Sequence, residues 1–121
     1  MFFIIFLLVT FSELCAASTH QQLVDNYSST YCLSLEAAYG EGMMSEGGSK
    51  ALEDMFRGIH PDHKRVLDIG SGLGGLPFYL AKKHRSQVTG VEINPWMVEE
   101  AKRRTPTGLA VDFVLITEDN L

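Results

Sequence analysis

Apolar positions follow a regular alternation along the second half of this chain. Short apolar runs at Val66–Ile69, Val88–Val91 and Val111–Ile116 predict three buried β-strands. The segments between them, Pro77–His84 and Trp96–Arg104, mix apolar and charged residues and predict helices. Because strands alternate with helices of this length, we expect a parallel sheet with right-handed crossovers.

The region before the first of these strands is predicted to be helical. Residues 21–39 are compatible with helix but are broken around Tyr27 to Thr30, and a glycine-rich loop follows at residues 39–48. Apolar residues at spacings of three and four then predict a helix with one apolar stripe, at Leu52, Met55, Phe56 and Ile59. Pro61 is expected to end it. The predicted order is therefore helices followed by β-α-β-α-β.

Residues 1–18 form an apolar N-terminal segment of a different kind. Met1 to Phe11 is almost wholly apolar and small residues follow, which is the outline of a secretory signal cleaved near Ala17. The run is shorter than the roughly 20 apolar residues of a membrane span, and no basic residue precedes it. Two interpretations stay open: a targeting or anchoring segment, or an upstream extension. Membrane contact is expected only through these residues.

Composition and charge narrow the class of protein. A chain of 121 residues that is 45% hydrophobic and 21% charged has the composition of one small globular domain. The net charge of −5 and the lack of a large basic cluster argue against a nucleic-acid partner. Cys15 and Cys32 have neither zinc nor redox spacing, so no metal site is predicted.

A glycine-rich turn follows the first predicted strand. Its sequence, Gly70-Ser71-Gly72-Leu73-Gly74-Gly75, lets the backbone turn sharply into a helix and approach a ligand without a Cβ in the way. The turn also satisfies the GxGxxG pattern of dinucleotide sites. Glu92 ends the second strand about 20 residues beyond the first glycine, where a carboxylate can accept both hydroxyls of a ribose. These features suit NAD and S-adenosylmethionine equally.

Asp68 distinguishes between the two ligands. It lies at the apolar end of the first strand, where a buried carboxylate is costly unless it is paired. A dinucleotide would bring a pyrophosphate there, and two anions repel one another. A sulfonium cofactor instead brings a cationic amino-acid end, which a carboxylate can hold. Glu118-Asp119 follows the third strand and can accept a hydrogen bond from an adenine amino group, so the strand ends favour a cationic adenosyl ligand.

The segment from Val66 to Gly75 resembles motif I of class I S-adenosylmethionine-dependent methyltransferases. Asn26-Tyr27, Tyr39-Gly40-Glu41 and Ser45-Glu46-Gly47-Gly48 are similar in order and spacing to the N-terminal lid of the phosphoethanolamine N-methyltransferase family. The resemblance implies a Rossmann-like class I methyltransferase fold of the α/β class, truncated after the β-α-β-α-β part of the sheet. Lid helices would occupy residues 19–60, and the cofactor-binding half residues 61–121.

The resemblance also implies which residues would bind S-adenosyl-L-methionine. In chain order they are Asn26, Met44, Ser45, Asp68, Gly70, Ser71, Gly72, Glu92, Ile93, Asp119 and Asn120. The glycine turn would line the methionine portion, the second strand end the ribose and adenine, and the third strand end the adenine edge. The two lid residues would close over the cofactor.

Tyr27 matches the catalytic tyrosine of the family, which helps to orient and deprotonate the acceptor amine. The alternative interpretation is an amphipathic tyrosine that packs under a lid helix. A tyrosine alone is a poor base at its usual pKa of about 10. The histidine and phosphate-binding residues that the family adds would lie after Leu121, so turnover by this chain alone stays an open question.

The sequence thus predicts a phosphoethanolamine N-methyltransferase-like chain that retains the cofactor site and takes a small-molecule amine acceptor. Three alternatives remain: a methyltransferase for another small molecule, a non-catalytic fragment of a split gene complemented by a second chain that supplies the missing strands, and an NAD-binding fragment, which Asp68 disfavours. Because the cofactor is intracellular, a cytoplasmic location is favoured; a secreted or anchored chain is the alternative if residues 1–18 act as a signal.

Overall fold

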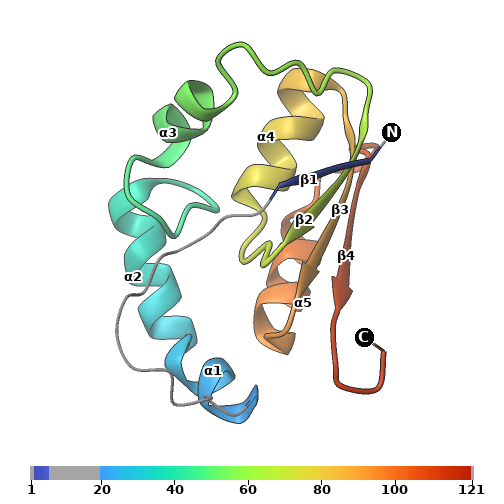
Figure 1. Cartoon of the computed structure of the whole chain (residues 1–121). Helices are drawn as coiled ribbons and strands as arrows, with labels where there is room; N and C mark the ends of the chain where they lie inside the picture. The colour runs from blue at the N-terminus through green and yellow to red at the C-terminus, as the bar shows by residue number, and fades with distance from the viewer. Residues whose placement is uncertain (1, 6–19, 121) are drawn as a thin grey trace.

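The computed structural model of the protein describes residues 2–5 and 20–120. One parallel sheet has the strand order β1 (Phe2–Ile5), β2 (Arg65–Ile69), β3 (Gln87–Glu92) and β4 (Val111–Leu115). The helices are α1 (His20–Asn26), α2 (Ser29–Tyr39), α3 (Gly48–Met55), α4 (Gly75–His84) and α5 (Pro95–Arg104). From β2 onward the elements alternate as the sequence predicts, and the strands all point toward one edge of the sheet, near α1 (Figure 1).

Local sequence signals explain where the two crossover helices begin and end. In α4, Pro77 occupies the first turn, where its missing N–H costs nothing, and three basic residues fill the last turn. In α5, the Asn94 side chain accepts a hydrogen bond from the Trp96 N–H, and Pro95 is the first helical residue. Both predicted helices are confirmed to within two residues.

The core lies on one face of the sheet. Val66 and Val88 point toward α4 and pack with Leu80, while Phe113 points toward α5 and packs with Val98. These five side chains are at most 3% exposed. The opposite face of the sheet carries no helix within the described residues (Figure 1), and Ile69 and Val114 on that face are exposed.

The structure corrects the sequence-based prediction at α3. The predicted helix extends through Ile59 to Pro61, but α3 ends at Met55. Gly58 has a φ of 80°, which an α-helix cannot accommodate. Phe56 is buried as predicted, whereas Ile59 is exposed and lies outside the apolar stripe.

The strand β1 was not predicted from the sequence. Phe2 to Ile5 pair in parallel with Arg65 to Asp68, so these four apolar and aromatic residues cover the edge of β2 that β3 leaves free. A short run of such residues is typical of a buried strand as well as of a signal segment. The residue types alone therefore do not distinguish the two. The predicted cleavage site near Ala17 lies outside the described residues. Within those residues, no helix is long and apolar enough to cross a membrane.

Candidate functional site

The glycine turn joins β2 to α4 at the carboxyl end of the sheet. The N–H groups of Gly70 and Ser71 both donate to the Val91 carbonyl, at 2.8 and 3.1 Å. This pairing extends the β2–β3 ladder by one step before the chain turns away. Gly70 and Gly72 then have φ values of 80° and 54°, a region in which residues with a Cβ are strained. The predicted turn is confirmed, and its shape requires glycine at both positions.

Glu92 holds this turn in place from the neighbouring strand. One carboxylate oxygen accepts the Gly72 N–H at 3.0 Å, and the other accepts the N–H groups of Ile93 and Asn94 at 2.8 and 3.0 Å. A carboxylate can accept about four hydrogen bonds, so this side chain retains little free capacity. Glu92 therefore fixes the turn between β2 and α4 against the end of β3, a role that sequence spacing alone did not indicate.

The loop between α2 and α3, the lid loop (residues 40–47), packs directly on the glycine turn. The Gly75 N–H donates to the Gly42 carbonyl at 3.2 Å, so the backbones of the two segments touch. A Cβ placed on Gly42 would lie 2.8 Å from the Gly75 Cα, and one placed on Gly72 would overlap the Met44 Cε. The structure thus brings Met44 against Gly72, while Ser45 in the same loop is exposed; that the two residues close over a cofactor stays a prediction.

Asp68 lies on the same buried face of the sheet as the core valines and is 4% exposed. Burial, together with the nearby negative charge of Glu92, raises its pKa from 3.8 to about 6. Among the described residues no cation pairs with it. A buried acid therefore lies at this strand end, as the sequence predicts, and it has no positive partner within residues 2–5 and 20–120.

Ser71, in the glycine turn, lies beside Gly90 of β3. Its hydroxyl is buried and has no hydrogen-bond partner in the part of the chain that the structure describes. A Cβ built on Gly90 would lie only 2.8 Å from both the Cβ and the hydroxyl oxygen of Ser71. The side chain thus fills the space above Gly90 in β3. An unpaired buried hydroxyl costs about 1–3 kcal/mol, which makes it a candidate partner for a bound polar ligand.

Tyr27 follows the last residue of α1, Asn26, and both side chains are exposed. The Tyr27 ring lies 6.2 Å from the Tyr31 ring on α2. Its carbonyl accepts a hydrogen bond at 3.1 Å from the side chain of Asn94, which caps α5. Asn94 therefore ties the end of α1 to the carboxyl end of β3.

Replacing Asn94 tests directly whether its side chain holds the end of α1 against β3. We expect Asn94→Ala to lower the free energy of unfolding by about 1–2 kcal/mol, because it removes both a helix N-cap and the bond to the Tyr27 carbonyl. Urea unfolding monitored by circular dichroism measures the change. Asn94→Ser retains a capping oxygen but is too short to reach Tyr27, so it should recover only part of the loss. Full recovery by serine would contradict the contact with Tyr27.

The segment after β4 forms a turn. The Asn120 side chain accepts the Thr117 N–H at 2.6 Å and donates to the Leu115 carbonyl at 3.0 Å, while Asp119 is exposed at the tip. Because β4 is parallel to β3, with Leu115 opposite Glu92, this turn lies at the same edge as Ile93 and the glycine turn. Sequence reasoning thus placed three predicted regions at one edge of the sheet correctly.

Sequence reasoning missed an ionic network at the last turn of α5. Arg104 at the end of α5 binds Glu36 on α2 and Glu100 one turn back in α5. Glu36 and Arg104 lie 68 residues apart, and Arg104 is one of three consecutive basic residues at the end of α5. No local pattern in the sequence could have paired them.

Comparison with known proteins shows which family has this sequence pattern. Residues 66–120 match the family described as a methyltransferase domain. Phosphoethanolamine N-methyltransferase 1 of Zea mays is 32% identical over 88 residues, which are 70% of this chain and 18% of the relative. Phosphoethanolamine N-methyltransferase 3 of Arabidopsis thaliana is 37% identical over 86 residues, 67% of this chain and 17% of the relative.

A solved structure gives the same result. Haemonchus contortus phosphoethanolamine N-methyltransferase 2 in complex with S-adenosyl-L-methionine superposes with a TM-score of 0.73 at 26% identity, over 84% of this chain and 25% of that chain. The chain thus spans less than a fifth of the curated plant relatives and a quarter of the solved one. The fold is that of part of a class I methyltransferase domain.

Proposed function

Because this chain carries part of a class I methyltransferase domain and has phosphoethanolamine N-methyltransferase homologues over most of its length, we propose that it binds S-adenosyl-L-methionine. The site would lie at the carboxyl ends of β2, β3 and β4, beneath the lid loop. As part of a phosphoethanolamine-type N-methyltransferase, it would take a small amine as methyl acceptor.

The observation that carries this proposal is the buried, unpaired Asp68. Its raised pKa means that a positive charge nearby would be strongly favoured, because it would offset both the burial and the repulsion from Glu92. The amino-acid end of S-adenosylmethionine supplies such a charge. The Ser71 hydroxyl, unpaired among the described residues, adds a polar group to the same turn, and the space beside Gly70 is open.

The packing of Gly75 argues against a dinucleotide. In a GxGxxG site the N-terminal N–H groups of the following helix face a pyrophosphate. Here the Gly75 N–H is already used by the Gly42 carbonyl of the lid loop. Gly75, the third glycine of the pattern, thus allows two backbones to pack closely. At Gly70, the first glycine, the carboxylate of Asp68 would repel the pyrophosphate of a dinucleotide.

When bound, the cofactor would supply an electrophilic methyl group on a sulfonium. The chain's own residues would align it: the glycine turn and Asp68 hold the amino-acid end, Glu92 keeps the turn rigid, and Met44 covers it. Tyr27 would face the acceptor amine as the catalytic residue and orient it, and its hydroxyl would take the amine's proton while giving its own to a base supplied by the rest of the methyltransferase domain. Tyr27, Asn26, Ile93 and the Asp119 turn remain proposed contacts.

Calorimetric titration of the full chain with S-adenosylhomocysteine, and separately with NAD, tests the proposal. The full chain is used because residues 2–5 are part of the sheet. We expect heat from S-adenosylhomocysteine and none from NAD. Binding of NAD alone would overturn the argument from Asp68, and binding of neither by a cooperatively folded chain would overturn the proposed function.

A further inference from the structure

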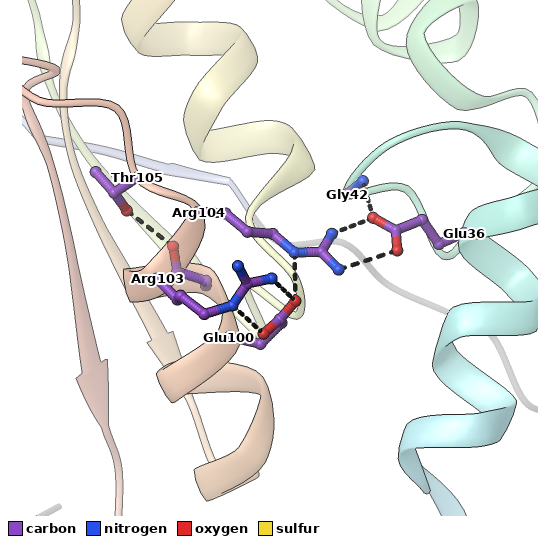
Figure 2. A network of polar contacts seen from close by, with 7 residues as sticks. Glu36, Gly42, Glu100, Arg103, Arg104 and Thr105 are labelled. Atoms are coloured by element: carbon purple, nitrogen blue, oxygen red, sulfur yellow. Dashed lines mark hydrogen bonds and ion pairs between the residues drawn. The ribbon is translucent and has the colours of Figure 1, made fainter.

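An ion pair connects the helix after β3 to the helix before the lid loop. Both guanidinium nitrogens at the tip of Arg104 bind the two carboxylate oxygens of Glu36, one of them at 3.2 Å (Figure 2). The Arg104 Nε also donates to Glu100 at 2.7 Å. The guanidinium is therefore fixed from two sides, with its fork directed at α2.

This pair differs from an ordinary surface salt bridge. The side chains of Arg104 and Glu36 are 16% and 14% exposed, whereas the adjacent Arg103, which binds Glu100 alone, is 70% exposed. Bidentate, largely shielded pairs are held more firmly than exposed ones, whose contribution is often negligible. The hydrogen bond from Arg104 keeps the pKa of Glu36 below its usual range.

Glu36 passes this constraint to the lid loop. The Glu36 Oε1, one of the two oxygens that bind Arg104, also accepts the Gly42 N–H at 2.7 Å. The Gly42 carbonyl in turn accepts the Gly75 N–H, and Met44 two residues later touches Gly72. A continuous path therefore runs from α5 through Glu36 to the backbone of the lid loop and on to the glycine turn.

We propose that the Glu36–Arg104 pair is a positioning element that holds the lid loop closed on the glycine turn and so sets how long the cofactor stays bound. The inference rests on the proposed function for its ligand, while the closed position of the loop is independent of it. Neither residue touches the proposed cofactor directly; both act through Gly42.

The test compares Arg104→Gln with Arg103→Gln in the full chain. The two variants remove the same charge from neighbouring positions of one helix, but only the first reaches Glu36. We expect Arg104→Gln to speed the dissociation of S-adenosylhomocysteine about threefold to tenfold in stopped-flow displacement, the loss of one shielded charged contact. Arg103→Gln should leave the rate unchanged. A dissociation rate does not depend on the fraction of folded chain, so simple destabilisation would not change it.

Two further measurements complete the test. Arg104→Lys retains a single charged contact with Glu36 and should restore the rate in part. Hydrogen exchange of the Gly42 amide, measured without ligand, should be faster in Arg104→Gln than in Arg103→Gln. Equal exchange in the two variants overturns the proposal whether or not the chain binds the cofactor. Wild-type binding combined with equal dissociation rates overturns only the link to cofactor residence and leaves the proposed function standing.

Discussion

Asp68→Asn should make the unliganded chain more stable at pH 7.5 while removing its affinity for S-adenosylhomocysteine. The pKa of Asp68 is raised from 3.8 to about 6 by burial and by the charge of Glu92. At neutral pH the folded chain must therefore hold a carboxylate that the unfolded chain ionises more readily. At 1.36 kcal/mol per unit of pKa, this costs the folded state about 3 kcal/mol.

The sign of the pH dependence follows from the same shift. Between pH 4 and pH 6 the folded chain binds more protons at Asp68 than the unfolded chain does, so its contribution to stability falls as the pH rises through this range. The amide in the Asp68→Asn variant cannot ionise and lacks this slope. It must still find hydrogen-bond partners in a buried place, so we expect a net gain of roughly 1–3 kcal/mol at pH 7.5.

Urea unfolding of the two proteins at pH 4, 5, 6 and 7.5 measures this effect. Other groups, such as Glu100, whose pKa the bonds from Arg103 and Arg104 lower to about 2, contribute equally to both proteins and cancel in the difference. The difference should be small at pH 4 and largest above pH 6. A difference in the free energy of unfolding that does not change with pH would show that the folded chain does not raise the pKa of Asp68.

Gly75→Ala should open the lid loop without weakening α4. Alanine favours helix over glycine by up to about 1 kcal/mol, and Gly75 is the first residue of α4. Its Cβ, however, would lie 2.5 Å from the Gly42 carbonyl oxygen and 2.8 Å from the Met43 sulfur. The two backbones must then separate, which typically costs about 1–3 kcal/mol. We expect affinity for S-adenosylhomocysteine to fall about tenfold, with helix content unchanged.

Calorimetry and circular dichroism measure the two effects, and Lys82→Ala on the exposed side of α4 is the control. The Gly42 amide should also exchange faster in Gly75→Ala than in the control. An unchanged affinity would mean that the lid loop can cover the cofactor without touching the turn. A loss of helix content would instead assign the effect to α4 itself.

The sequence predicted most of the sheet and the part of the site that lies on it. Strands β2 to β4 and helices α4 and α5 carry strong local signals, such as the apolar run around Leu67 and the Asn94-Pro95 cap. The glycine turn could be located because a backbone at positive φ favours glycine, so such a turn is visible as a glycine-rich segment. Its neighbours Asp68 and Glu92 could be placed because parallel strands end at a common edge.

Contacts between distant segments could not be predicted from the sequence. The bond from Asn94 to Tyr27 joins residues 67 apart, and the partners of Glu36 depend on how α2 lies against α5. The prediction that Glu92 faces a ribose stays a prediction, and within the chain its carboxylate accepts three backbone N–H groups. A carboxylate at a strand end can serve both purposes, and the sequence alone does not reveal its backbone partners.

The position of β1 has a consequence for how the chain reaches its folded state. Phe2 to Ile5 pair with Arg65 to Asp68, so these residues are synthesised long before their partner strand exists. The strands β2, β3 and β4 and their helices are linked by much shorter connections. Since closing a long loop costs entropy before its contacts form, assembly should begin around β2 and β3 and end with the docking of β1.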